Sequence, residues 1–444
     1  MSRFAKILEQ QYGIPTVGAA AETMVKYGTG YDFLYTNGMP IRYVAIPFPV
    51  AGQPASVHKR YVEGIDTHSG KPMMTAIIDA LTKPLTEQEK FAGMPPEAMP
   101  EPRLLKPDTE ENLHHLFKDK DWTDYNPIVL PTEERVAAML KGTSHKPDEV
   151  VNTISWPGGA RDLTVEKAAV AAVMAGAKPE YMPVILAVAT QVPFGNSTSS
   201  MANMIVVNGP IVKEIGMNPG TNAMGPHNDA NAVIGRVFTI LSKTVGNLHS
   251  GKTTFSTLGS NLQYNNVTIA ENEDLLPEGW QPFHVQMGFK PGDSVVTVGT
   301  GWTYISSVGE VQKAYPPQKL MRDYMRSLTG LGATIIMDPT VAALLKNTQG
   351  FNSKQDLSKW FSENVEKTAE SYWGNGVVST MFASLALQGL EPYATSYKAP
   401  PDTLIKPFNN ARAIQVLVVG GAIQTTWFVT DFRLGRGVLV DDWR

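Results

Sequence analysis

Residues 164–189 contain two consecutive helical segments that are apolar around most of their circumference. Thr164 is a good N-cap residue for the first segment, the run 168–175 is almost wholly apolar, and Gly176 ends it. Pro179 begins the second segment. A helix without a polar face has to be covered on several sides. The two segments therefore predict a substantial core around which the rest of the chain is organised.

The size and charge of the chain restrict its class. It has 444 residues, which favours two or three domains. Its formal net charge of -4 gives no global reason to expect nucleic acid. It contains no cysteine, so it supplies no disulfide, no thiolate nucleophile and no iron–sulfur ligand. Without a secretory signal or a membrane-length apolar run, we expect a soluble, cytoplasmic protein.

The alternation of helical and strand patterns predicts a multi-domain α/β protein. The expected parts are a partial N-terminal Rossmann-like unit over 1–50, an extended linker or wrapping arm over 51–125, a central α+β domain over 126–290 and a C-terminal α/β domain over 291–444. The glycine pairs that follow two expected strands, at 299–301 and 420–421, are similar but too weak a signal to predict a repeat.

The N-terminal unit starts on a helix, where a βαβ unit would place a strand first. Two interpretations remain open. The first helix packs on the sheet of its own chain, or another subunit supplies the missing strand.

Polar residues crowd the start of an expected helix near 229. His227, Asn228, Asp229 and Asn231 follow a glycine-rich loop. Asn228 and Asp229 are both good N-cap residues, and one cap needs only one side chain. His227 and Asn231 are then left for another role. Backbone N–H groups of such a loop at a helix N-terminus can bind a small anion, so we expect a substrate-binding role for this loop.

Two carboxylates and a histidine form the second candidate constellation. Glu271 and Glu273 would share one face of an expected strand, and His284 follows in an otherwise apolar context. A solvated strand face and a satisfied core histidine are the ordinary explanations. The alternatives are a divalent metal site of Glu271, Glu273 and His284, or an acid/base set that also includes His227.

Two further residues are expected to line the same pocket. Asn208 ends an apolar strand, and Arg161 could anchor a substrate carboxylate. Common nucleotide and hydrolase motifs are missing: there is no GxxxxGK[ST], HExxH, GxSxG or complete GxGxxG.

Several segments, among them GPHNDANAVIGR, AENED and FHVQMGF, together resemble the UGSC-type selenoprotein-related family, which is distantly similar to selenoprotein B of glycine-type reductases. The resemblance covers roughly residues 130–290 and implies a loop with Gly-Ser-Cys or selenocysteine before the segment YGIPTVGAA. This chain has no cysteine, and it carries Ala177 where the family commonly has cysteine and His227 where it has a smaller residue. The resemblance therefore implies either a small companion subunit that brings the Gly-Ser-Cys-type loop or the loss of thiol chemistry.

Three functions remain open at this point. The first is the large subunit of a hetero-oligomeric enzyme that acts on a small anionic molecule by acid/base or metal-assisted chemistry, of lyase, hydratase or hydrolase type. The second is a substrate-positioning subunit of a reductase whose partner carries the redox-active residue. The third is a non-catalytic scaffold subunit.

Overall fold

The computed structural model describes most of the chain and confirms the α/β class. The described residues are 2–22, 42–47, 50, 52–87, 102–156, 159–191, 201–250, 258–309 and 315–444. No helix in these ranges is both long enough and apolar enough to cross a membrane.

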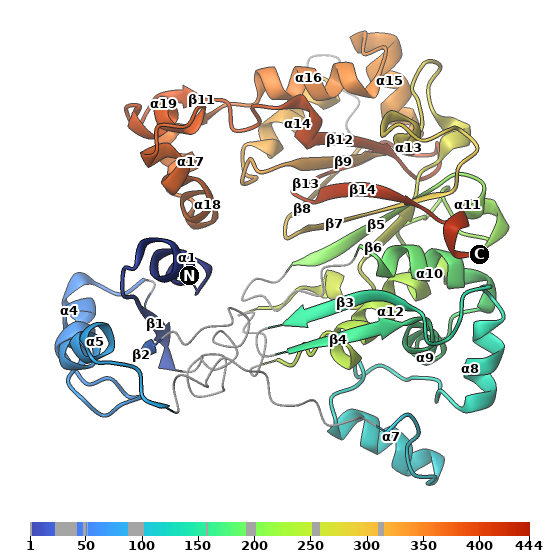
Figure 1. The fold of residues 1–444 in the computed structure, drawn as a ribbon. Helices are drawn as coiled ribbons and strands as arrows, with labels where there is room; N and C mark the ends of the chain where they lie inside the picture. Colours follow the sequence, from blue (N-terminus) through green and yellow to red (C-terminus); the bar gives the residue numbers. More distant parts are fainter. Residues whose placement is uncertain are drawn as a thin grey trace.

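Two four-stranded sheets form the centre of the molecule (Figure 1). The first has the order β14 (Arg433–Leu439), β7 (Val295–Gly301), β5 (Ala202–Asn208), β6 (Val267–Ala270), and the second has the order β8 (Tyr304–Val308), β13 (Thr426–Thr430), β9 (Ala333–Met337), β12 (Ile414–Val418). Within these two sheets, the pairs β5/β6 and β9/β12 are parallel and the remaining pairs are antiparallel.

The two sheets are built alike, which indicates an internal repeat. In chain order, β5, β6, β7 and β8 correspond to β9, β12, β13 and β14, but the last strands are exchanged. β8 follows β7 yet pairs with β13, and β14 follows β13 yet pairs with β7. The sequence retains a trace of the repeat. Gly-Met-Asn at 216–218 follows the helix after β5, and Gly-Phe-Asn at 350–352 follows the helix after β9. Both glycines have positive φ.

This exchange corrects one expectation. The predicted domain boundary at 290 falls between β6 and β7, which belong to one sheet, so the two repeats make a single structural unit. The glycine pairs that looked similar in sequence are not equivalent, because Gly299 and Gly301 lie in β7 whereas Gly420 and Gly421 follow β12. The counterpart of β12 is β6.

The two crossovers between the sheets contact each other closely. The Oδ1 atom of Asp431 accepts hydrogen bonds from the backbone N–H groups of Trp302, at 2.8 Å, and Thr303, at 2.7 Å. A Cβ atom at Gly301 would lie 2.8 Å from the same oxygen and from Phe432, so only glycine fits here without a shift.

The strands alternate their side chains between helices and the opposite sheet. In β5, Ile205 and Val207 pack with the helices, whereas Met204 and Val206 face Ile336 and other residues of the second sheet. Figure 1 shows the resulting order of layers: helices, sheet, sheet, helices. On the outside of the second sheet lie α14 (Pro317–Met325), α15 (Pro339–Gln349) and α16 (Lys354–Asn364).

The two apolar helices predicted from the sequence lie in the layer that covers the first sheet. They are α9 (Val165–Ala175) and α10 (Met182–Ala189), and they pack with α12 (Asp229–Thr244). Thr164 caps α9 by accepting a hydrogen bond from the backbone N–H of Lys167, and Gly176 ends it at φ 83°. Nearly every residue of both helices is buried. Around them lie α7 (Glu110–Asp119), α8 (Glu133–Leu140), β3 (Val150–Trp156) and β4 (Gly159–Thr164).

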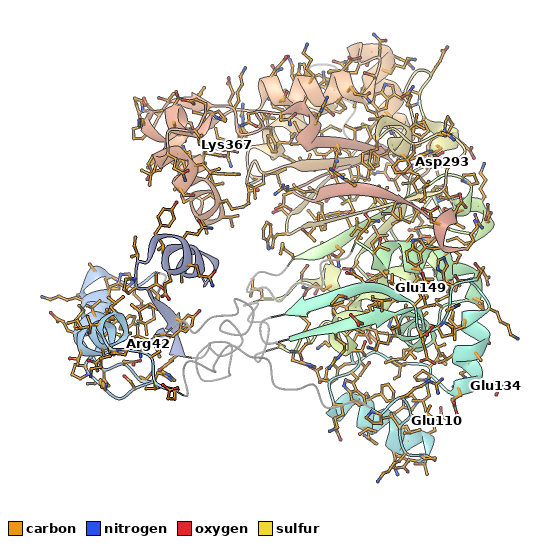
Figure 2. The ribbon with its side chains drawn as sticks, viewed as in Figure 1. Arg42, Glu110, Glu134, Glu149, Asp293 and Lys367 are labelled. Carbon is orange, nitrogen blue, oxygen red and sulfur yellow. The ribbon has the colours of Figure 1, made fainter. Side chains whose placement is uncertain are left out.

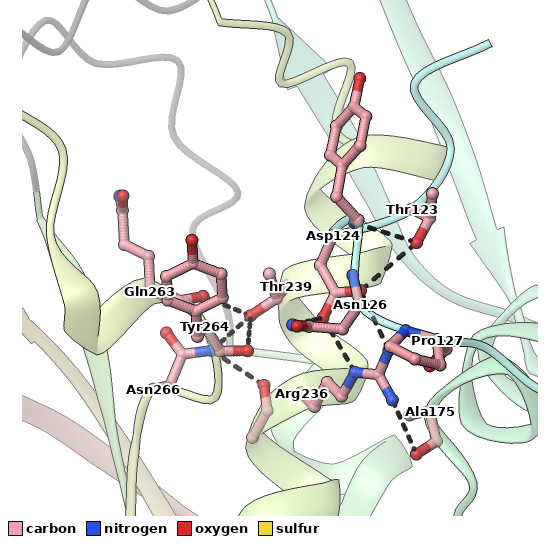
Figure 3. Close-up of polar contacts among 12 residues, drawn as sticks. Thr123, Asp124, Asn126, Pro127, Ala175, Arg236, Thr239, Gln263, Tyr264 and Asn266 are labelled. Atoms are coloured by element: carbon pink, nitrogen blue, oxygen red, sulfur yellow. Dashed lines mark hydrogen bonds and ion pairs between the residues drawn. The ribbon is translucent and has the colours of Figure 1, made fainter. Parts of the chain in front are cut away.

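An ion pair fixes the chain before α8 to the outer side of α12 (Figure 3). Arg236 binds Asp124 through two hydrogen bonds, from Nε to Oδ2 at 2.8 Å and from Nη2 to Oδ1 at 3.0 Å. Its Nη2 atom also donates to the carbonyl of Pro127 at 2.7 Å. Burial by itself would raise the pKa of Asp124, but the bonds from Arg236 lower it below its usual value.

The N-terminal unit is larger than expected. It starts on the expected helix, α1 (Ser2–Tyr12), and contains two parallel strands, β1 (Val17–Ala21) and β2 (Arg42–Ile46). The segment 51–125 is not a continuous arm, because it contains α4 (Ala55–Glu63) and α5 (Met73–Thr82), which belong to this unit, and also α7. Arg42, labelled in Figure 2, donates to the last carbonyls of α5. The proline-rich part of the expected arm, 88–101, lies outside the described residues.

The remaining short elements are α11 (Ile211–Glu214), α13 (Phe283–Gln286), β10 (Lys367–Thr368), α17 (Ala369–Trp373), α18 (Gly376–Leu387), α19 (Tyr393–Lys398), β11 (Leu404–Ile405) and the 3₁₀ turns η1 (Pro179–Tyr181), η2 (Asn261–Gln263), η3 (Glu273–Leu275), η4 (Ala411–Ala413) and η5 (Asp441–Trp443).

A histidine holds the C-terminus against the segment before β3. His145 stacks on Trp443 with ring centroids 4.8 Å apart. Its Nδ1 atom lies 2.9 Å from a carboxylate oxygen of Glu149, and its Nε2 atom lies 2.8 Å from the carbonyl oxygen of Asp442. Both neighbours are acceptors, so only the protonated ring can donate to both. The hydrogen bond to Glu149 raises the pKa of His145 above its usual value of 6.5.

We predict that this anchor makes stability depend on pH. Because the folded-state pKa of His145 is raised, its contribution is complete below about pH 6.5 and is lost as the pH rises through the raised pKa. Urea unfolding of the wild type should therefore show a lower free energy of unfolding at pH 8.5 than at pH 6, and His145→Gln should reduce that difference. An unchanged pH dependence in the variant would contradict this role.

Candidate functional site

A fully buried carboxylate lies at the carboxyl ends of β5 and β6. Glu271 follows the last residue of β6 and is 2% exposed. Its Oε2 atom accepts hydrogen bonds from Asn208 Nδ2, at 3.0 Å, and from the backbone N–H of Phe283, at 2.6 Å. Its Oε1 atom accepts from Lys354 Nζ, at 2.5 Å, and from the backbone N–H of Val418, at 3.2 Å. Both oxygens are therefore occupied by protein donors.

Lys354, the cationic partner, was not anticipated from the sequence. It is the first residue of α16 and is 1% exposed. Burial lowers the pKa of Lys354, and the charge of Glu271 opposes this effect. The local sequence indicates only a helix start, since Ser353 and Asp356 form a capping box around it. A lysine in the first turn of a helix normally reaches solvent, so nothing local marks it as buried.

Glu273 and His284 adjoin this ion pair, but not by the geometry predicted. β6 ends at Ala270, and Glu273 begins η3, so the two glutamates do not share a strand face. They meet because Asn208 Nδ2 donates to both, at 2.8 Å to Glu273 Oε1. His284 is completely buried with Nδ1 3.4 Å from Glu273 Oε1, yet neither ring nitrogen forms a hydrogen bond within the described residues.

The expected metal site of Glu271, Glu273 and His284 finds no support in this arrangement. The described residues contain no group of three or more His, Asp or Glu side chains placed to hold a metal ion. The physical reason is the saturation of Glu271, whose two oxygens already accept four hydrogen bonds. The ion pair instead joins the two repeats, because Glu271 follows β6 and Lys354 begins α16.

The asparagines at the start of α12 hold a loop. Asn228 occupies the N-cap position, but its side chain makes no capping hydrogen bond. Its Nδ2 atom donates to the carbonyls of Asn222, at 2.5 Å, and Gly225, at 2.8 Å. The Oδ1 atom of Asn231 accepts from the backbone N–H of Asn218 at 3.0 Å, and its Nδ2 atom returns a bond to the Asn218 carbonyl at 3.1 Å. The expected cap is thus wrong, and these amides fix the loop 218–228.

Three other predicted residues lie away from the buried cluster. His227 is exposed with φ 77°, a backbone conformation that residues other than glycine rarely adopt. Asp229 forms an ion pair with Lys178 at 2.9 Å and accepts a hydrogen bond from the Tyr181 hydroxyl at 2.9 Å. Arg161 donates to the carbonyl of the last residue of α12 at 2.7 Å. α12 begins near the carboxyl ends of β5 and β6 and runs toward their amino ends. Arg161, which contacts the last residue of α12, therefore lies near the amino ends of these strands.

A cavity of about 470 Å³ lies at the carboxyl ends of the other parallel pair, β9 and β12. Its walls come from the end of β9, from the turn after β12, from β13 and from the loop 218–228 of the first repeat, which Asn228 and Asn231 fix. The lining residues are Thr221, Asn222, Ala223, Met224, Gly225, Ile336, Met337, Asp338, Val419, Gly420, Gly421, Ile423, Gln424, Thr426 and Phe428. Asp338 is the single charged side chain among them.

Asp338 is the carboxylate of this cavity, and it is not among the site residues predicted from the sequence. It caps α15, with Oδ1 accepting from the backbone N–H of Val341 at 2.9 Å, and its Oδ2 accepts from the backbone N–H of Thr426. Burial raises the pKa of Asp338 above its usual value, although these backbone hydrogen bonds act in the opposite direction. The sequence Met-Asp-Pro indicated only the end of a strand and the start of a helix.

The buried cluster and the cavity are directly connected. Val418, which accepts a hydrogen bond from the backbone N–H of Asn272 at 2.8 Å, also donates to Glu271. The Asn272 side chain donates to the carbonyl of Gly420 at 2.8 Å. Gly420, with φ 100°, lines the cavity. The cluster therefore positions the glycine turn that forms one wall of the cavity.

Comparisons with known proteins give no relative: no family model, curated protein or solved structure matches the chain. The resemblance to the UGSC-type family stays a prediction.

We predict that Lys354→Met destabilises the protein by about 3–5 kcal/mol, because it leaves the charge of Glu271 buried without its cation. The double variant with Glu271→Gln should lose less than the sum of the two single variants. Urea unfolding measures all three free energies. A loss below about 1 kcal/mol for Lys354→Met, the range of exposed ion pairs, would contradict the role of this pair.

Proposed function

We propose that the chain is an enzyme, or the large subunit of one, which acts on a small molecule bound in the cavity between the two repeats. Asp338 serves as the general acid or base. The observation that carries this proposal is a buried carboxyl group whose pKa is raised by burial and which is the only charged group among the described residues that line a 470 Å³ cavity.

The position of the cavity supports this proposal. In α/β sheets, ligands bind outside the carboxyl ends of parallel strands, where the loops diverge. The cavity lies at the ends of β9 and β12, and its volume falls within the usual range for small-molecule sites. Hydration, elimination and hydrolysis all require a positioned group that exchanges a proton with the substrate. A lyase, hydratase or hydrolase therefore fits the cavity.

The proposal changes the residues expected to react. Glu271, Glu273 and His284 are not among the described lining residues, so they are not expected to react. Glu271 supports the cavity indirectly, through its hydrogen bond from Val418. His227 and Arg161 are also absent from the lining. The loop between Asn208 and Asn231 keeps its predicted substrate-binding role, but through Thr221, Asn222 and their neighbours.

We predict that Asp338→Asn strongly reduces the turnover rate. Asparagine retains one oxygen for the N–H of Val341 but cannot exchange a proton, so the rate should fall by about 10²–10⁴-fold. The assay incubates the purified protein with a metabolite extract of its native source and follows depleted and newly formed compounds by mass spectrometry. Compounds converted by the wild type should persist with the variant.

Asp431→Asn is the matched control for this experiment. Asp431 is also buried and accepts two backbone hydrogen bonds, but it does not line the cavity. It should therefore retain turnover. Conversion of the same compounds by Asp338→Asn at the wild-type rate would refute the acid/base role.

A companion subunit is the second part of the proposal, supported by the N-terminal unit. Among the described residues, the parallel sheet β1–β2 has only two strands, although parallel sheets are normally larger and covered on both faces. The outer edge of β2 is occupied, because Asp66 accepts the backbone N–H of Ala45 at 2.7 Å. A strand from a companion, such as the resemblance implies, would add to the edge of β1.

We expect the protein purified from its native source to contain a second, smaller chain in stoichiometric amount. Native mass spectrometry measures the masses and the ratio. Deuterium exchange of β1 should be slower in that complex than in the separately produced chain, because added backbone hydrogen bonds protect its amides. A native-source protein that contains this chain alone would refute the companion.

A further inference from the structure

We propose that the cavity at the carboxyl ends of β9 and β12 takes an organic cation: a small amine whose ammonium group pairs with Asp338 and whose apolar body lies against Phe428 and Met224. This inference rests on the proposed function for the location of the site and adds the chemical class of its ligand. It replaces the anionic substrate predicted from the sequence.

The charges of the lining favour a cation. Asp338 forms no ion pair with a described lysine, arginine or histidine, and the other fourteen lining residues are uncharged. Asp338 is buried, and backbone N–H groups hydrogen-bond both of its oxygens but bring no positive charge. A bound ammonium group would supply that counter-charge. The same lining offers no side chain that would neutralise a substrate carboxylate or phosphate.

The helix that points at the cavity does not provide an anion site either. The N-terminus of α15 is the feature that would normally attract a negative group. Here Asp338 already caps that terminus, with its Oδ1 atom 2.9 Å from the backbone N of Val341. A second anion at this place would meet the carboxylate. The cap therefore converts a helix end suited to anions into a site of negative charge.

The rest of the lining suits an apolar body. Phe428 and Ile336 come from the side of the second sheet that faces the first, and Met224 comes from the asparagine-held loop. Tyr304 supports this wall, since its ring lies 4.5 Å from that of Phe428 and its hydroxyl lies 3.4 Å from the sulfur of Met224. Aromatic rings also attract organic ammonium groups, and the flexible methionine side chain adapts to the shape of an apolar ligand.

A close contact between the two repeats limits the size of the ligand on one side of the cavity. Gly421 lies against Thr221, since a Cβ atom added to the glycine would be 2.2 Å from the threonine hydroxyl. This contact closes one side of the cavity between the two repeats. Gln424 and Asn222 remain as lining groups that can hydrogen-bond a second polar substituent of the amine.

The test compares three probes of similar shape: 2-phenylethylamine, 2-phenylethanol and 3-phenylpropionate. Binding to the full-length protein at neutral pH and low ionic strength is measured by isothermal titration calorimetry and by saturation-transfer NMR. We expect the amine to bind about 10-fold more tightly than the alcohol, as a charge-assisted hydrogen bond allows, and the carboxylate to bind more weakly than either. Asp338→Asn should lower the affinity for the amine to that for the alcohol.

Two further variants locate the binding. Met224→Trp fills the cavity from its loop and should abolish binding of the amine. Leu387→Trp is its control, because Leu387 is 75% exposed on α18 and does not line the cavity. Asp431→Asn, which removes a buried carboxylate elsewhere, should leave the affinity unchanged. Circular dichroism checks that each variant is folded.

The outcomes separate this inference from the proposed function. Equal affinity for the three probes, preference for the carboxylate, or no measurable binding of the amine overturns the cationic ligand, even if turnover depends on Asp338. Preference for the amine that Asp338→Asn removes supports the cationic ligand, even if no turnover is found. Amine binding that survives both Asp338→Asn and Met224→Trp places it elsewhere and overturns the inference.

Discussion

The buried ion pair between Glu271 and Lys354 is the interaction on which the arrangement of the two repeats depends. Removing both charges from water is costly, and their attraction repays this only when the remaining polar atoms are also satisfied. Here the carboxylate accepts backbone N–H groups of Phe283 and Val418 and the amide of Asn208 as well. These partners come from β5, α13, β12 and α16, so they meet only if both repeats are correctly placed. The pair thus selects one arrangement of the sheets.

The internal repeat explains a difference between the two pairs of parallel strands. Side chains fill the space at the carboxyl ends of β5 and β6, whereas a cavity lies at the carboxyl ends of β9 and β12. Glu271 and Val419 are equivalent, since each directly follows the last residue of β6 or β12 and donates its backbone N–H to the neighbouring strand, at Val207 of β5 or Met337 of β9. Lys354 and Gly220 are equivalent as well, because Lys354 lies four residues after Gly350 and Gly220 lies four residues after Gly216. At the carboxyl ends of β5 and β6, Glu271 of the first repeat and Lys354 of the second fill the space with their side chains. At the carboxyl ends of β9 and β12 the counterparts are Val419 and Gly220, which carry no charge, and a cavity remains there beside Asp338.

The sequence predicted much of the fold but less of the site. The apolar pattern located α9, α10 and the strands, because burial imposes that pattern on each segment separately. Asn208, Glu271, Glu273 and His284 were expected together and do lie together, although β6 is too short for the strand face from which this was inferred. Lys354 was missed because it lies 83 residues from its partner, and no local pattern records so distant a contact.

What the sequence by itself determined is local: which segments are helices and strands, where α9 begins and ends, and which chemistry the absence of cysteine rules out of this chain. The exchange of β8 and β14, the burial of Lys354 and the cavity beside Asp338 were decided by the tertiary structure alone. The physical reason is that helix caps and apolar periodicity act over a few residues. Ion pairing, sheet order and cavity shape depend on groups that approach each other only after the two repeats have packed.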